Sequence, residues 1–246
     1  VNQLLLNISK TKKAESPQLK SLILQKKGIE LWKQLEKDLK SDFELEITGG
    51  LMVAENDEDI AFLKNKISAE NKYGIETVLI GGEDVKKQIP HVSKNIIAAA
   101  YCPGEGKINP MLATPALAKE AERLGTKYNL ETTVLSIEKE KHYFLVKTNN
   151  GVIKSKYLVN AAGGWSSKIT EMLGIKMPVL SAPQQMIVTE SSVPIIPSMI
   201  SHAHRHLTMK QIKNGNLIIG GRWFAGYNKK LNRTFNYNNA ISGNLW

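Results

Sequence analysis

The chain has 246 residues, an apolar fraction of 42% and a formal net charge of +10. This length and composition are typical of a folded domain with a substantial core, or of two closely joined domains, and exclude a disordered chain. No apolar run is long enough to cross a bilayer and no signal-peptide pattern is present, so we expect a cytoplasmic protein without a transmembrane segment. The single cysteine, Cys102, excludes an intrachain disulfide and a multi-cysteine metal site.

The positive charge comes almost entirely from lysine, since the only arginines are Arg123, Arg205, Arg222 and Arg233. The lysines are spread along the chain, and no segment concentrates arginine with aromatic side chains as nucleic-acid surfaces do. In the densest segment, residues 20–40, lysines alternate with an apolar stripe, as on a solvated helix face. We therefore predict no nucleic-acid partner.

Local patterns predict a succession of helices and strands. Ser16-Pro17 supplies an N-cap and a first helical residue, and Gly74 and Gly125 are placed to end helices. We expect helices at about 17–40, 57–73, 110–124 and 165–173, and a short one that ends before residue 90. We expect strands at 43–48, 51–54, 77–80, 96–101, 184–189, 206–211 and 217–221, and three more within 130–160.

The last of these three strands leads into a junction of small residues. Tyr157-Leu158-Val159 is continuously apolar, which predicts a fully buried parallel strand. It is followed by Ala161-Ala162-Gly163-Gly164, whose small side-chain volume would let another molecule approach the backbone closely. Tight packing between a helix and a strand explains the same four residues, and both alternatives stay open on this segment alone.

Motifs of the best-known catalytic and nucleotide-binding sites are missing. No Gly-x-Gly-x-x-Gly follows a strand, and we interpret Gly104-Glu105-Gly106 as a surface turn. His202, His204 and His206 alternate at strand spacing and would share one face of a sheet. They could form a metal site, but no acidic or cysteine ligand lies nearby in sequence, so we favour a polar sheet face and predict no metal.

Several segments together resemble the D-amino-acid oxidase superfamily of FAD-dependent oxidoreductases, which includes glycine oxidase and sarcosine oxidase. The segment 157–166, YLVNAAGGWS, is similar to the family's strand that passes FAD, "V-N-A-A-G-x-W-S". Further similar segments follow the family's order, so that the resemblance covers about residues 50–226. They lie at 50–51, 106–110, 124–134, 184–190 and 206–221.

The resemblance implies two sets of site residues. The expected cofactor-binding residues are Val134, at the adenine end of FAD, and Ala161, Ala162, Gly163 and Trp165. The expected substrate-facing residues are His206, Thr208, Lys210 and Arg222. Arg222 could pair with a carboxylate, although a surface or domain-contact arginine is an equal alternative. The resemblance identifies no catalytic acid or base.

The resemblance also implies the fold and its division. We expect an α/β (α+β) fold with a mixed, largely antiparallel substrate-domain sheet, flanking helices and part of an FAD-binding Rossmann-like domain. The FAD-binding part would be 1–48 and 105–180, and the substrate-binding part 49–104 and 181–246. The family's dinucleotide fingerprint would precede Val1 and its closing flavin segment would follow Trp246, so we expect a fragment of a longer enzyme.

The function implied is oxidation of the C–N bond of a small amine or amino acid by hydride transfer to flavin N5, which gives an imine that later hydrolyses. One alternative is a 2-hydroxy-acid or polyol dehydrogenase of the same superfamily. Another is a cofactor-free binding or assembly domain. The electron acceptor could be oxygen or a partner protein, and a partner subunit is compatible with the sequence.

Overall fold

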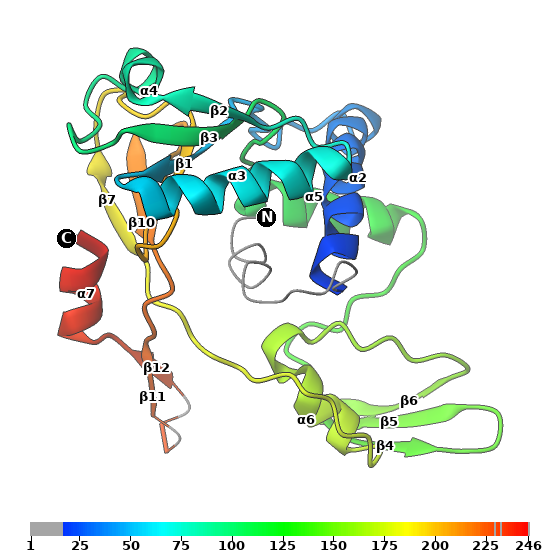
Figure 1. Ribbon diagram of the computed structural model, residues 1–246. Coiled ribbons are helices and arrows are strands. Elements are labelled where there is room, and N and C mark those ends of the chain that lie inside the picture. Colours follow the sequence, from blue (N-terminus) through cyan, green and yellow to red (C-terminus); the bar gives the residue numbers. More distant parts are fainter. Residues whose placement is uncertain (1–16, 229, 232, 246) are drawn as a thin grey trace. The chain divides into compact units, whose positions relative to one another are not determined.

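The computed structural model describes residues 17–228, 230–231 and 233–245 (Figure 1). The chain divides into two compact units. Unit 1 comprises Val1–Glu120, Gln184–Phe224 and Phe235–Trp246, and unit 2 comprises Ala121–Pro183 and Ala225–Thr234. Each unit therefore contains separate stretches of chain. The assignment of segments to an FAD-binding and a substrate-binding domain stays a prediction.

Unit 1 is built around a seven-stranded sheet with the order β2-β3-β1-β8-β9-β10-β7. All neighbouring strands are antiparallel except β1 and β8, which confirms the expected mixed, largely antiparallel sheet. Its strands in chain order are β1 (Gly50–Ala54), β2 (Val78–Gly81), β3 (Ala98–Cys102), β7 (Ile187–Ser191), β8 (Met199–His202), β9 (Thr208–Gln211) and β10 (Asn216–Gly220).

The helices of unit 1 begin and end close to the positions that the sequence predicts, except for the last one, at residues 238–245, which was not predicted. They are α2 (Pro17–Asp38), α3 (Asp57–Lys72), α4 (Gly82–Gln88), α5 (Pro110–Arg123, which extends into unit 2) and α7 (Asn238–Leu245). The Asn56 side chain caps α3 by accepting a hydrogen bond from the Asp59 backbone N–H at 2.9 Å. After α3, Gly74 adopts φ 73°, which suits glycine. None of the described helices has the length and apolarity needed to span a membrane.

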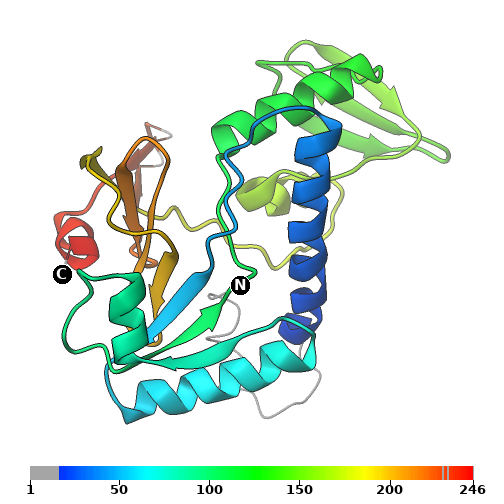
Figure 2. The ribbon, with the colours of Figure 1, turned by 90° about the horizontal axis from the view of Figure 1, so that it is seen from above.

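The core of unit 1 lies on both faces of the sheet, because side chains alternate along each strand. On one face Leu51 and Val53 pack with Val85 of α4. On the other, Met52 and Ala54 pack with Phe62 and Leu63 of α3, which runs along this face (Figure 2). The alanines of β3, at 98 and 100, leave room for α3 to approach the sheet.

Unit 2 contains a three-stranded antiparallel sheet of β4 (Val134–Lys139), β5 (Phe144–Thr148) and β6 (Gly151–Ser155). The turn between β5 and β6 lies at the predicted Asn-Asn-Gly, with Gly151 at φ 126°. A short 3-10 turn, η2 (Gly163–Trp165), leads into α6 (Ser166–Glu171). A small pair, β11 (Gly226–Asn228) and β12 (Arg233–Phe235), joins this unit near its return to unit 1.

One predicted strand, at 43–48, is wrong, and the last of the three strands expected within 130–160 forms only as far as Ser155. Between residues 43 and 48 the structure has only an isolated bridge from Glu46 to Lys107, because Glu44 has a left-handed φ of 53° that interrupts the extended backbone. Tyr157 and Val159 are 75% and 86% exposed and lie in no strand. A parallel strand needs neighbours for its backbone hydrogen bonds, and the described part of the chain supplies none to this segment.

Candidate functional site

Helix α3 covers one part of one face of the sheet. On the same face, over β8, β9, β10 and the residue before β7, lies a small cavity. The pairs Met52–Ser201, Ser201–Thr208 and Lys210–Ile218 place side chains of these strands on that same face. The cavity has a volume of about 220 Å³. Its lining residues are Met186, Met199, Ile200, Ser201, Thr208, Met209, Lys210 and Ile218.

Lys210 is the charged residue of this cavity. Its side chain is half-buried, and burial lowers the pKa of its ammonium group, with a smaller contribution in the same direction from the positive charge of Lys107. Lys107 itself is occupied, because its Nζ lies 2.9 Å from Glu46 Oε2 and donates to the carbonyl oxygen of Gln211. Lys210 has no acidic partner among the residues that the structure describes.

A second, larger cavity of about 750 Å³ lies between the β8–β9 turn, Trp223 and α7. His206 lines it and meets Trp223 edge-on, with the ring centroids 5.9 Å apart. A Cβ on Gly221 would overlap the carbonyl oxygen of His206, so glycine is needed where the end of the β9–β10 hairpin passes this turn. His206 therefore lines a different cavity from Thr208 and Lys210.

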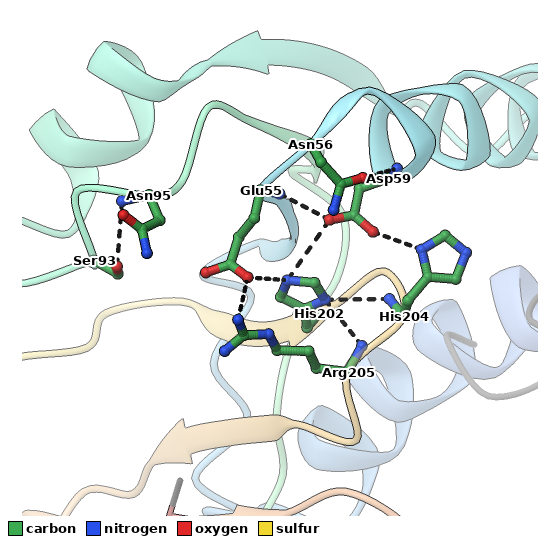
Figure 3. A network of polar contacts seen from close by, with 8 residues as sticks. All are labelled: Glu55, Asn56, Asp59, Ser93, Asn95, His202, His204 and Arg205. Atoms are coloured by element: carbon green, nitrogen blue, oxygen red, sulfur yellow. Dashed lines mark hydrogen bonds and ion pairs between the residues drawn. The ribbon is translucent and has the colours of Figure 1, made fainter.

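A polar network fixes the β8–β9 turn to the start of α3 (Figure 3). His202 Nδ1 accepts hydrogen bonds from the backbone N–H groups of His204 and Arg205, at 3.1 and 3.0 Å. Its Nε2 faces Glu55 at 3.4 Å and Asp59 at 3.8 Å. Asp59 also pairs with His204, and Arg205 Nη2 lies 2.8 Å from Glu55. The network thus positions the turn that leads into β9.

The three histidines do not form the single face that their spacing predicts. β8 ends at His202, and the chain bends between residues 203 and 206 before β9 begins. His202 is buried, His204 contacts Asp59, and His206 contacts Trp223. Among the described residues no group of three or more His, Cys, Asp or Glu side chains is arranged to hold a metal ion.

The predicted cofactor-binding residues all lie in unit 2. Val134 begins β4 and pairs with Thr148, and the others form the junction before α6. Gly163 has a left-handed φ of 54°, and a Cβ there would meet open space. Trp165 is 63% exposed. The apolar side chains of Tyr157, Val159 and Leu180, which belong to the same unit, are exposed as well.

The predicted substrate-facing residues all lie in unit 1. Thr208 and Lys210 share the smaller cavity and His206 lines the larger one. Arg222 follows Gly221 at a left-handed φ of 70° and lines neither of these cavities. Met199 and Ser201 were not predicted, since β8 is a four-residue strand without regular alternation. Ile218 could have been found from the register of the hairpin at residues 213–216.

Comparison of the sequence with models of known protein families identifies the family. A family model described as "FAD dependent oxidoreductase" matches residues 9–240. The chain belongs to this family. Membership confirms the resemblance drawn from the sequence and makes FAD the cofactor of the family to which the chain belongs.

Relatives in the family agree with this placement. Sarcosine oxidase subunit beta of an Arthrobacter species is 27% identical over 205 residues, which are 80% of this chain and 50% of that protein. L-proline dehydrogenase from P. horikoshii has a similar structure, with a TM-score of 0.81 and 29% identity over 90% of this chain and 59% of that one. Glycine oxidase from Bacillus cereus ATCC 14579, at 21% identity, shares the fold with a TM-score of 0.77 over 95% of this chain and 64% of that one.

The chain spans about half the length of the sarcosine oxidase subunit. At the junction of unit 2, the left-handed Gly163 has open space above its backbone and the ring of Trp165 is exposed, so a large planar cofactor could approach this segment. That Val134, Ala161, Ala162, Gly163 and Trp165 bind FAD stays a prediction.

Proposed function

We propose that the protein to which this chain belongs oxidises the C–N bond of a small amine or amino acid. The names of its relatives carry this proposal: sarcosine oxidase, dimethylglycine dehydrogenase and L-proline dehydrogenase are each named for an amino acid. Dimethylglycine dehydrogenase of Rattus norvegicus is 27% identical over 174 residues, covering 70% of this chain and 20% of that protein.

FAD, when bound, supplies the hydride acceptor for this reaction. The chain's own contribution is to bind and orient the substrate. The side chains of Met186, Met199 and Ile218 would exclude water from an alkyl group, and the Thr208 hydroxyl and Lys210 ammonium would fix its polar end. Because both residues lie on β9, two positions apart, their side chains share one face of the sheet and their spacing is set by the strand.

The test begins with the absorption spectrum of the purified chain with added FAD, after gel filtration. A retained oxidised-flavin spectrum would show that the residues present bind the cofactor. Anaerobic addition of sarcosine, dimethylglycine, proline and glycine should then bleach the flavin, and the amine or ammonia released should be detected chemically. If flavin is retained and none of these compounds bleaches it, the proposed amine chemistry is wrong.

A second candidate is oxidation of a hydroxyl group. Glycerol 3-phosphate dehydrogenase of Caloramator mitchellensis is 28% identical over 204 residues, covering 80% of this chain and 42% of that protein. Bleaching by glycerol 3-phosphate or a 2-hydroxy acid, but not by amino acids, would favour this alternative. A chain that binds no FAD would instead favour a cofactor-free domain.

A further inference from the structure

The chain contains two Asn-Gly dipeptides, and each lies at a hairpin turn. Asn150-Gly151 lies between β5 and β6, and Asn214-Gly215 lies between β9 and β10. Asparagine before glycine is prone to deamidation, because glycine has no side chain to shield its backbone nitrogen from the asparagine amide. The two dipeptides share this chemistry, so the structure around each of them decides how readily it reacts.

The turn at Asn214 is held from several sides. The Gly215 N–H donates to the carbonyl oxygen of Ile212 at 2.8 Å. The carbonyl oxygen of Asn214 accepts a hydrogen bond from Ser191 Oγ at 2.6 Å. Gly215 is buried, and a Cβ on it would lie 2.4 Å from the carbonyl oxygen of Ser192. The backbone nitrogen of Gly215 therefore cannot turn toward the asparagine side chain unless this part of the hairpin opens.

The turn at Asn150 is open by comparison. Asn150 and Gly151 are both exposed, and a Cβ on Gly151 would meet no atom within 4 Å. The Asn150 side chain is oriented by its Nδ2, which donates to Thr132 Oγ1 at 2.9 Å. Water and a solvent base can reach this dipeptide, and the conformational range of glycine allows the turn to rearrange.

We propose that Asn150 is a site of spontaneous deamidation, and that the fold protects the same dipeptide at Asn214. The Gly151 nitrogen attacks Asn150 Cγ, and a new C–N bond closes a cyclic imide. The Gly151 N–H proton passes to a solvent base, and the side-chain nitrogen takes up a solvent proton and leaves as ammonia. Water then opens the imide at either of its carbonyl groups, which gives aspartate or isoaspartate at position 150. Neither FAD nor a substrate takes part, so this inference is independent of the proposed function.

The modification changes the β5–β6 turn in two ways. It replaces the Nδ2 donor that contacts Thr132 with a carboxylate oxygen, and it adds a negative charge to unit 2. Isoaspartate also lengthens the main chain by one carbon, directly beside the pair Thr148–Gly151 that begins the β5–β6 ladder. We expect the modified turn to be looser than the original one, with faster hydrogen exchange at residues 148–152.

The experiment compares the two dipeptides in one purified chain. The chain is incubated at pH 8 in water enriched in oxygen-18, and the peptides that contain Asn150 and Asn214 are followed by mass spectrometry. Deamidation adds about 1 Da, or about 3 Da when the incoming oxygen is oxygen-18. Asn150 should convert faster than Asn214 by about tenfold or more, because reaction at Asn214 requires local opening. The proposal is overturned if Asn150 stays intact or if Asn214 converts as fast.

Unfolding separates the effect of the structure from that of the local sequence. In concentrated urea both dipeptides should convert at similar rates, because neither hairpin remains. If Asn150 stays equally far ahead of Asn214 in the unfolded chain, the neighbouring residues set the difference and the protection by the fold is wrong.

A variant identifies the reacting residue, since Asn149 lies in the same peptide as Asn150. Asn150→Ser removes the reacting amide from an exposed turn position, so the mass gain of this peptide should disappear while that of the Asn214 peptide is unchanged. A mass gain that persists in this variant would assign the reaction to Asn149 and overturn the proposal.

Discussion

At the residue scale, Asp59 links three parts of unit 1. Its carboxylate accepts the Glu55 backbone N–H at 2.8 Å and pairs with His204, while its own N–H bonds to Asn56. Asp59→Asn would weaken these charge-assisted contacts of a side chain that is only 1% exposed, so we expect a loss of about 1–3 kcal/mol of unfolding free energy. Urea unfolding measures the change. Asp57→Asn, on the exposed first turn, is the control and should cost less than Asp59→Asn.

The same network makes the stability depend on pH. Burial lowers the pKa of His202 below its ordinary 6.5, and outweighs the opposite effect of Asp59 and Glu55. The unfolded chain therefore takes up a proton at His202 more readily than the folded chain, so stability should fall as the pH drops below 6.5. For Asp59, burial raises the pKa, but hydrogen bonds from Glu55 and His204 and the histidine charges outweigh it, so a further loss is expected below pH 3.8.

Urea unfolding at pH 8, 6 and 5 tests the histidine part of this prediction. His202→Gln should flatten the dependence between pH 6.5 and 5, since glutamine does not titrate. An unchanged slope in that variant would assign the pH dependence to other groups.

At the scale of the elements, the β9–β10 hairpin depends on close contact with the turn before it. Gly221→Ala would place a Cβ on the carbonyl oxygen of His206, and the backbone on both sides would have to shift. We expect this overpacking to lower the free energy of unfolding by about 1–3 kcal/mol. Gly28→Ala is the opposite case, because Gly28 lies inside α2 with open space around it. Alanine there should raise the free energy of unfolding by about 0.5–1 kcal/mol. Thermal unfolding measures both variants: Gly221→Ala should lower the unfolding temperature and Gly28→Ala should raise it. An unchanged unfolding temperature for Gly221→Ala would contradict the predicted crowding.

The elements also show what the sequence could predict. Helices with caps and terminating glycines, such as α3 between Asn56 and Gly74, were found because their signals are local. β8 was missed, since its place between β1 and β9 depends on partners far along the chain. The segment at Tyr157 was misassigned for the same reason: an apolar run indicates burial, but the partner that covers it is not encoded locally.

At the scale of the whole molecule, the candidate site was only partly predictable. Thr208 and Lys210 follow from strand alternation once the strand is placed. The position of His206 does not follow from strand alternation, because the turn at residues 203–206 ends the alternation. The His206 ring contacts Trp223 instead. The cofactor-binding residues rest on the family resemblance, and their contact with FAD is a matter for experiment.

Hydrogen exchange of the whole chain, with and without FAD, tests that contact. Residues 157–162 lie outside helices and strands, and Tyr157 and Val159 are exposed, so amides from 157 to 165 should exchange quickly without FAD. Bound FAD would cover Ala161, Ala162 and Gly163 and slow their exchange. Strand β3, buried in the other unit, is the reference and should be protected in both conditions. Retained FAD with unchanged exchange at the junction would mean that the cofactor is held by other residues.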